Sequence, residues 1–222
     1  MSQIHYRYPG LKPFEVSDAQ LFFGRSQESR DLYNLVIVER LLVLFAKSGM
    51  GKTSLLNAGL IPLLGKTDLL PAYVRFNDTA RSLHEQFLQK MEAAGIVFNP
   101  QYANKTLWEQ LKHAQATKNG SPATPLIIFD QFEEIFTLYT PEQRQHFVRE
   151  IAHVANRKIP ETVEAELLRL VRENPEVSDE TLAEMERQPP VRIIFSIRSD
   201  LLHLLNGLSV QIPDILRSRY EL

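Results

Sequence analysis

Lys52 and Thr53 are the residues whose types and spacing most directly suggest chemistry. They end the stretch AKSGMGKT at 46–53, which matches the phosphate-loop pattern G-x-x-x-x-G-K-[ST] except that Ala46 replaces the first glycine. In such loops backbone N–H groups surround the phosphates, the lysine reaches the terminal phosphates, and the hydroxyl joins the shell of a magnesium ion. We therefore predict phosphate contacts from the following residues: Ser48, Gly49, Met50, Gly51, Lys52, Thr53 and Ser54.

The segments on either side of this loop are the elements that would hold it in place. Leu41–Phe45 is a continuous apolar run of strand length, and leucines at helical spacing follow from position 55. A helix that begins after the loop points its unpaired backbone N–H groups at a bound anion. Gly49 and Gly51 can adopt the backbone conformations that such a loop requires. This order of strand, loop and helix favours a phosphate loop over an ordinary glycine-containing turn.

A second apolar run, Leu126–Phe129, is followed by a carboxylate at Asp130. Magnesium takes oxygen ligands, so Asp130 and the Thr53 hydroxyl could hold Mg²⁺ beside the phosphates. The alternative is a strand that simply ends in a turn. Glu133 and Glu134 follow closely, and either could deprotonate an attacking water. Their spacing alone does not separate these two residues.

The alternation of strand and helix patterns predicts an α/β fold in which helices cover both faces of a parallel sheet. Polar residues at the carboxyl ends of the strands, namely Lys52, Asp130 and Arg198, would then converge on a ligand. We expect strands at 41–46, 73–77, 126–130 and 191–197, helices at about 27–39, 81–94, 105–116, 141–155 and 200–206, then a helix from 213 and one more strand.

The composition is that of an ordinary globular chain of 222 residues. Hydrophobic residues make up 44%, the net charge is −2, and cysteine is absent. The balanced charge does not indicate a nucleic-acid or membrane partner, and the absence of cysteine excludes disulfides and thiolate metal sites. No apolar run approaches the roughly 18 residues of a membrane-crossing helix, and the first residues do not resemble a signal peptide. We therefore expect a cytoplasmic protein.

Residues 157–190 differ in composition from the rest of the chain. They contain two amphipathic patterns separated at Pro175 and no aromatic residue. We interpret them as a helical hairpin inserted into a single domain that spans residues 1–222. Such a hairpin is either a solvated flap or a partner-docking element. Trp108, on an earlier helical pattern, is better explained as a core residue than as a platform for a base.

Four motifs together with the phosphate loop resemble a known family. They are the arm Tyr8–Phe14, the element Phe22-Phe23-Gly24-Arg25, the helical segment 57–62 and the acidic stretch 130–136. In this combination the chain resembles the bacterial novel STAND NTPases, relatives of NACHT domains, over nearly its whole length. The resemblance implies that residues 1–25 form an N-terminal arm and a base-side element, in which Phe23, Gly24 and Arg25 contact the adenine of ATP or ADP.

The resemblance also implies roles at the phosphate end of the site. Glu134 is the first choice for the base, with Glu133 as the alternative. Arg198 would sense the γ-phosphate, although an ion pair with Asp200 is equally compatible with its position. The strand order would be the second strand, the Asp130 strand, the Arg198 strand, the phosphate-loop strand and then a fifth. The absence of an Asn-Lys-x-Asp guanine motif favours ATP over GTP.

The function implied by the resemblance is a regulated switch that binds Mg-ATP, hydrolyses it slowly, and thereby controls self-association or effector activation, often in bacterial defence. Sensor and effector domains would belong to a larger multidomain protein of which this chain is a fragment. Two other functions stay open. One is a nucleotide-dependent scaffold without hydrolysis, which the substitution at Ala46 favours. The other is a nucleic-acid motor or loader, for which we see neither a basic groove nor stacking aromatics.

Overall fold

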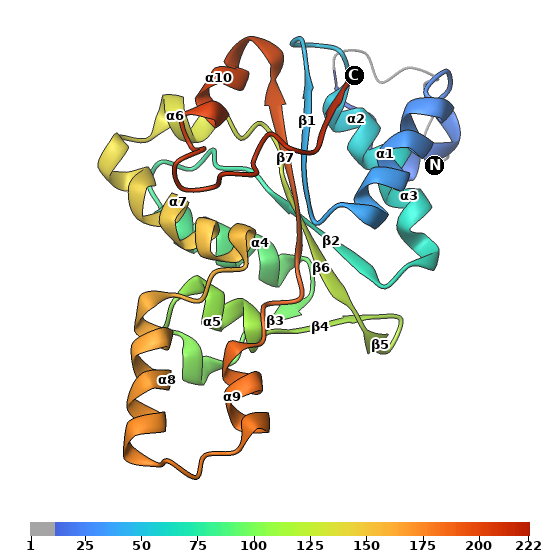
Figure 1. Ribbon diagram of the computed structural model, residues 1–222. Coiled ribbons are helices and arrows are strands. Elements are labelled where there is room, and N and C mark those ends of the chain that lie inside the picture. Colours follow the sequence, from blue (N-terminus) through green and yellow to red (C-terminus); the bar gives the residue numbers. More distant parts are fainter. Residues whose placement is uncertain (1–11) are drawn as a thin grey trace.

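Five parallel strands form the central sheet of the computed structural model, which describes residues 12–222 (Figure 1). They are β1 (Leu41–Ala46), β2 (Leu69–Val74), β6 (Thr124–Phe129), β7 (Arg192–Arg198) and β8 (Arg219–Glu221). Their order in the sheet is β2-β6-β7-β1-β8, which confirms the predicted order and the fifth strand. The predicted arm at Tyr8–Leu11 lies outside the described residues.

Helices cover both faces of this sheet, as the alternating pattern predicts. Figure 1 shows α1 (Ser26–Val38), α2 (Lys52–Ser54) and α3 (Ile61–Leu63) on one side and α4 (Leu83–Ala93) and α7 (Pro141–Asn156) on the other. Successive side chains of a strand point to opposite faces. Accordingly, Leu42 and Leu44 of β1 belong to the core under α1, whereas Val43 belongs to the core under α4 and α7.

The helix that follows the phosphate loop is not a regular α-helix throughout. Between α2 and α3 the chain forms a π-helical segment, η2 (Leu55–Leu60), in which every residue is buried. Gly59 in this segment lies against α1 so closely that an added Cβ would be 2.5 Å from the Ser29 hydroxyl oxygen. The glycine therefore sets the distance between α1 and the helix that carries the phosphate loop.

Three predicted elements differ from the structure. The second strand covers 69–74 rather than 73–77; it is an edge strand, where Pro71 removes no ladder hydrogen bond. The predicted helix at 105–116 is wrong beyond Lys112, because α5 covers only Leu107–Lys112 and residues 115–118 form a strand. The predicted helix from 213 is also wrong, since turns lead from there to β8.

The strand at 115–118 belongs to a small antiparallel sheet that the sequence did not reveal. This sheet contains β3 (Ile96–Val97), β4 (Gln115–Lys118) and β5 (Ser121–Pro122). Lys118 Nζ donates hydrogen bonds to the backbone oxygens of Leu64, Thr67 and Leu69, at 2.6, 3.0 and 3.0 Å. The small sheet thus fastens the end of the phosphate-loop helix to the start of β2.

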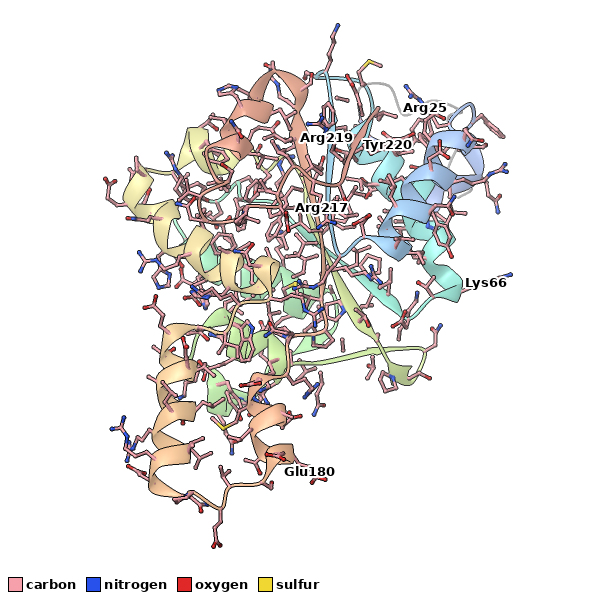
Figure 2. All side chains as sticks on the ribbon, in the orientation of Figure 1. Arg25, Lys66, Glu180, Arg217, Arg219 and Tyr220 are labelled. Carbon is pink, nitrogen blue, oxygen red and sulfur yellow. The ribbon has the colours of Figure 1, made fainter. Side chains whose placement is uncertain are left out.

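The predicted helical hairpin consists of α8 (Glu161–Glu173) and α9 (Asp179–Glu186). It projects from the end of the sheet opposite to α6 (Glu134–Leu138) and α10 (Leu202–Asn206), and Figure 2 shows Glu180 on its outer side. Lys112 of α5 donates to the backbone oxygens of Glu184 and Met185, and Trp108 donates to the Gln188 side chain at 3.0 Å. Trp108 is 1% exposed, which confirms its placement in the core.

Short 3-10 segments complete the described chain: η1 (Val16–Leu21), η3 (Leu64–Lys66), η4 (Pro100–Tyr102) and η5 (Ser199–Leu201). Within residues 12–222, none of the helices combines the length and the apolar character that a membrane crossing requires.

Candidate functional site

The register of the parallel strands brings the predicted phosphate-end residues to one edge of the sheet. In the pairing of β1 with β7, Ala46 lies opposite Arg198. In the pairing of β6 with β7, Phe129 lies opposite Phe195, so that Asp130 follows next to Ser196. The loop after β1 and the turn after β6 therefore meet at the carboxyl edge, where parallel sheets of this kind bind ligands.

The phosphate loop has the backbone that its two glycines predict. Gly49 and Gly51 have φ angles of 79° and 87°, in the left-handed region that favours glycine. Lys52 begins α2, and its Nζ donates to the backbone oxygen of Ala46 at 3.3 Å. Ala46 is the last residue of β1 and does not have a positive φ. The alanine in place of the usual first glycine therefore causes no backbone strain here.

Asp130 is held by two hydroxyl groups from different elements. The carboxylate is 4% exposed and accepts hydrogen bonds from Thr53 Oγ1 at 2.8 Å and from Ser196 Oγ at 2.9 Å. Thr53 and Asp130 together present hard oxygen ligands, which is the donor set that Mg²⁺ prefers while it keeps waters and phosphate oxygens. The residues therefore fit a magnesium ion held jointly with a nucleotide. Sequence reasoning missed Ser196, although a hydroxyl inside an otherwise apolar strand is a signal.

Glu133 is a buried carboxylate close to Lys52. It is 7% exposed, and its Oε2 has no hydrogen-bond partner within residues 12–222. Burial raises the pKa of Glu133, against the opposing effects of nearby N–H groups and of Lys52. Burial likewise lowers the pKa of Lys52, although Glu133 and Asp130 favour its charged form. An unpartnered buried oxygen is unusual and indicates a group that is completed by something else.

Glu134 has a different environment from its neighbour. Its Oε2 accepts a hydrogen bond from Arg75 Nε at 3.0 Å, and its Oε1 accepts one from Arg75 Nη2 at 2.6 Å. These hydrogen bonds to Glu134 raise the pKa of Arg75. Sequence reasoning missed Arg75, because the predicted strand at 73–77 placed it inside the strand, whereas β2 ends at Val74, directly before it. The structure thus separates two glutamates that the sequence could not distinguish.

Most of these side chains line a cavity of about 710 Å³ at the carboxyl edge; Asp130 does not line it but is hydrogen-bonded to Thr53, which does. Arg198 contributes to its wall and also pairs with Asp200 at 2.7 Å, so the two sequence-based alternatives for this arginine are both compatible with the structure. The lining residues are Lys12, Pro13, Phe14, Ser48, Gly49, Gly51, Lys52, Thr53, Ser54, Arg75, Gln131, Glu133, Glu134, Thr137, Arg198 and Leu201.

Four predicted nucleotide contacts do not line this cavity. Met50 lies in the loop but is 42% exposed, and Phe23 is 70% exposed. Arg25 forms an ion pair with Glu28 at 3.0 Å, next to Gly24. Their contact with a nucleotide stays a prediction. The N-terminal segment reaches the cavity through Phe14 instead, whose backbone N–H donates to Ser54 Oγ at 3.1 Å.

A larger cavity, of about 830 Å³, lies beside the amino end of β1 and includes Arg40 in its wall. The Arg40 guanidinium donates to the backbone oxygens of Val154 and Ala155 at the end of α7 and to that of Val191. Burial, with the neighbouring Arg157 and Arg192, lowers the pKa of Arg40 to about 10. Arg40 therefore has a structural role, and this cavity lacks the combination of groups found at the carboxyl edge.

Comparison with known protein families gives a match over most of the chain. A search of the curated proteins found no match. The family model described as Novel STAND NTPase 1 matches residues 8–215, which include every strand of the central sheet except β8. The match extends over nearly the whole chain, and the fold is an α/β sheet of the P-loop type with the phosphate loop at its carboxyl edge. The chain therefore belongs to the novel STAND NTPase family.

Proposed function

We propose that this chain is an ATPase domain that acts as a nucleotide-dependent switch. The single observation that carries the proposal is the cavity at the carboxyl edge, which is lined by Lys52 of the phosphate loop, Glu133 of the turn after β6 and Arg198 at the end of β7. Membership of an NTPase family supports nucleotide binding in general. The choice of ATP, its hydrolysis and the switch function are our proposals.

The phosphate loop would bind the β- and γ-phosphates. Its backbone N–H groups and the start of α2 favour an anion. Lys52 is almost fully buried beside Glu133 and Asp130, so its charge would be set against the terminal phosphates rather than against bulk water. Phe23, Gly24 and Arg25, and also Met50, remain candidates for further nucleotide contacts.

Thr53 and Asp130 would hold the magnesium ion, which neutralises phosphate charge when bound. The two residues already share a hydrogen bond of 2.8 Å, and Ser196 orients the other carboxylate oxygen. Ion binding would require the Thr53 hydroxyl to turn its lone pair outward. The hydrogen bond that Asp130 then loses would be replaced by the ion or its water shell.

Hydrolysis would take place at the wall formed by the two glutamates. A water oxygen attacks the γ-phosphorus, the bond to the bridging oxygen breaks, and its electron pair leaves with ADP. The proton of the water passes to a glutamate, for which the family resemblance favours Glu134 and burial favours Glu133. Arg198 lies on the same cavity wall and would contact the γ-phosphate after leaving Asp200.

The hydrolysis that we propose is slow, and its purpose is to reset the switch. In the longer protein, binding of ATP would promote self-association through this domain and activate an effector, as the family resemblance implies, for instance in bacterial defence. We propose a cytoplasmic location for this switch.

The test is ATP binding and phosphate release by the wild-type chain and by the Lys52→Ala variant. A lost charge-assisted contact of about 1.5–3 kcal/mol corresponds to a loss of affinity of at least about tenfold. Lys66→Ala is the matched control, because Lys66 is exposed at the far end of the same helix. If Lys52→Ala binds ATP as tightly as wild type, the proposal fails. Binding without any phosphate release would instead favour the non-hydrolysing scaffold.

A further inference from the structure

Arg75 lies in the cavity wall and takes no part in the phosphate, magnesium or proton-transfer contacts proposed for the site. It follows β2 directly, and β2 is the edge strand beside β6, so its guanidinium lies next to the turn that carries the two glutamates. It contacts Glu134 through two nitrogen atoms, at 2.6 and 3.0 Å. This two-point contact fixes the direction of the carboxylate as well as its position.

The contact with Arg75 makes the two neighbouring glutamates unequal. Both oxygens of Glu134 accept hydrogen bonds from Arg75, whereas Glu133 keeps one buried oxygen without a partner in the described chain. Glu133 is also the carboxylate that lies close to Lys52, where the terminal phosphate would bind. A base needs a free lone pair directed at the water that it deprotonates. Each oxygen of Glu134 keeps a second lone pair but is directed toward Arg75, whereas Glu133 Oε2 has no partner in the described chain that directs it away from a water.

We propose that Arg75 is a positioning residue that holds Glu134 aside, so that Glu133 is the carboxylate that accepts the proton of the attacking water. This inference rests on the proposed ATPase function and deepens it. It assigns the base to the residue that the family resemblance placed second. It also gives Glu134 a different role, which is to keep the Arg75 guanidinium at the rim of the cavity.

The ion pair is suited to positioning rather than to stability. The Arg75 side chain is 44% exposed and that of Glu134 is 18% exposed, and pairs as exposed as this contribute little to folding. Replacing Arg75 should therefore lower Tm by no more than about 4 °C. Without Arg75, however, Glu134 would become a second free carboxylate next to the phosphates. It would repel the γ-phosphate and compete with Glu133 for the water.

The experiment measures kcat, KM and ATP affinity for single and double variants. Glu133→Gln should lower kcat by about 100-fold or more with ATP binding retained, and the fall in kcat caused by Glu134→Gln should be at least about tenfold smaller than that caused by Glu133→Gln. Arg75→Ala should lower kcat by about tenfold, and the double variant with Glu134→Gln should recover most of that loss. Arg81→Ala is the matched control, because Arg81 is half exposed, pairs with Asp78 and lies outside the cavity.

Two results would overturn the inference while leaving the proposed function intact. One is an inactive Glu134→Gln beside an active Glu133→Gln, which assigns the base to Glu134. The other is a double variant no faster than Arg75→Ala, which removes the positioning role. Arg75→Lys repeats the measurement with the charge retained, in case the alanine variant does not fold. Wild-type protein that neither binds nor hydrolyses ATP would overturn the proposed function itself.

Discussion

Gly59 lies where the phosphate-loop helix touches α1, and the space that a side chain would need is already filled. A Cβ at this position would lie 2.5 Å from Ser29 Oγ, 3.0 Å from Leu55 Cδ1 and 3.3 Å from Phe22 Cε1. The Ser29 hydroxyl cannot move freely, because it donates to the backbone oxygen of Arg25 at 2.7 Å. Gly59→Ala should therefore separate the two helices or displace this hydrogen bond.

The expected decrease in the free energy of unfolding is the sum of two destabilising effects and one stabilising effect. Overpacking a buried contact costs about 1–3 kcal/mol, and loss of the Ser29 hydrogen bond costs about 1 kcal/mol. Alanine in place of glycine within a helix stabilises the folded state by about 1 kcal/mol. We expect Gly59→Ala to lower the free energy of unfolding by about 1–3 kcal/mol, equivalent to a fall in Tm of roughly 2–12 °C. Urea denaturation followed by circular dichroism measures this difference.

The control and the refutation use the same assay. Gly65→Ala should be neutral or slightly stabilising, since nothing lies within 4 Å of its Cβ position and its φ is not positive. In a Ser29→Ala background, the cost of Gly59→Ala should shrink, because the nearest contact is gone. If Gly59→Ala is as stable as wild type, or if its cost is unchanged without the Ser29 hydroxyl, the packing explanation is wrong.

Three further predictions concern other parts of the chain. Lys118→Met should lower the free energy of unfolding by about 1–3 kcal/mol, because three backbone oxygens lose their hydrogen-bond donor. Lys66→Met should change the free energy of unfolding little, since the Lys66 side chain points into solvent in Figure 2. Lys112→Met should speed hydrogen exchange in α9, because it removes the hydrogen bonds from Lys112 to the backbone oxygens of Glu184 and Met185, without a comparable change in the central sheet. Equal protection of α9 in the wild type and the variant would contradict a role for this contact in holding α9. Because burial raises the pKa of Glu133, that carboxylate takes up a proton at a higher pH than an ordinary glutamate, so hydrolysis should fall as the pH is lowered through this raised pKa. A rate that stays constant down to the ordinary glutamate pKa of 4.5 would be inconsistent with Glu133 as the base.

Much of the fold could be predicted because its signals are local. Strand β1, the loop and the following helix are encoded by an apolar run, two glycines and a lysine that are adjacent in the sequence. The errors fall where a local pattern was overridden by pairing. Residues 115–118 look helical when read with α5, but Thr117 and Lys118 pair with the strand that follows. The second strand was predicted at 73–77, whereas pairing with β6 already begins at Leu69.

The candidate site was predictable in the same uneven way. Its phosphate loop and the carboxylate at Asp130 could be identified because each follows a strand that the sequence reveals. Arg75 could not be assigned to Glu134, since 59 residues separate them. Only the sheet order places the end of β2 beside the turn after β6. A side chain's partner depends on strand order and register, which local sequence patterns describe poorly.

The sequence by itself therefore determined the chemistry that this chain can hold: a phosphate loop, a carboxylate for a metal ion, two candidate bases, and a parallel sheet to carry them. The tertiary structure alone decided which partners those groups have. It placed Ser196 on Asp130, Phe14 on Ser54 and Arg75 on Glu134, and it left Glu133 buried with a free oxygen. The physical reason is that residue types set what a group can do, whereas burial and hydrogen-bond partners, which arise only on folding, set which group does it.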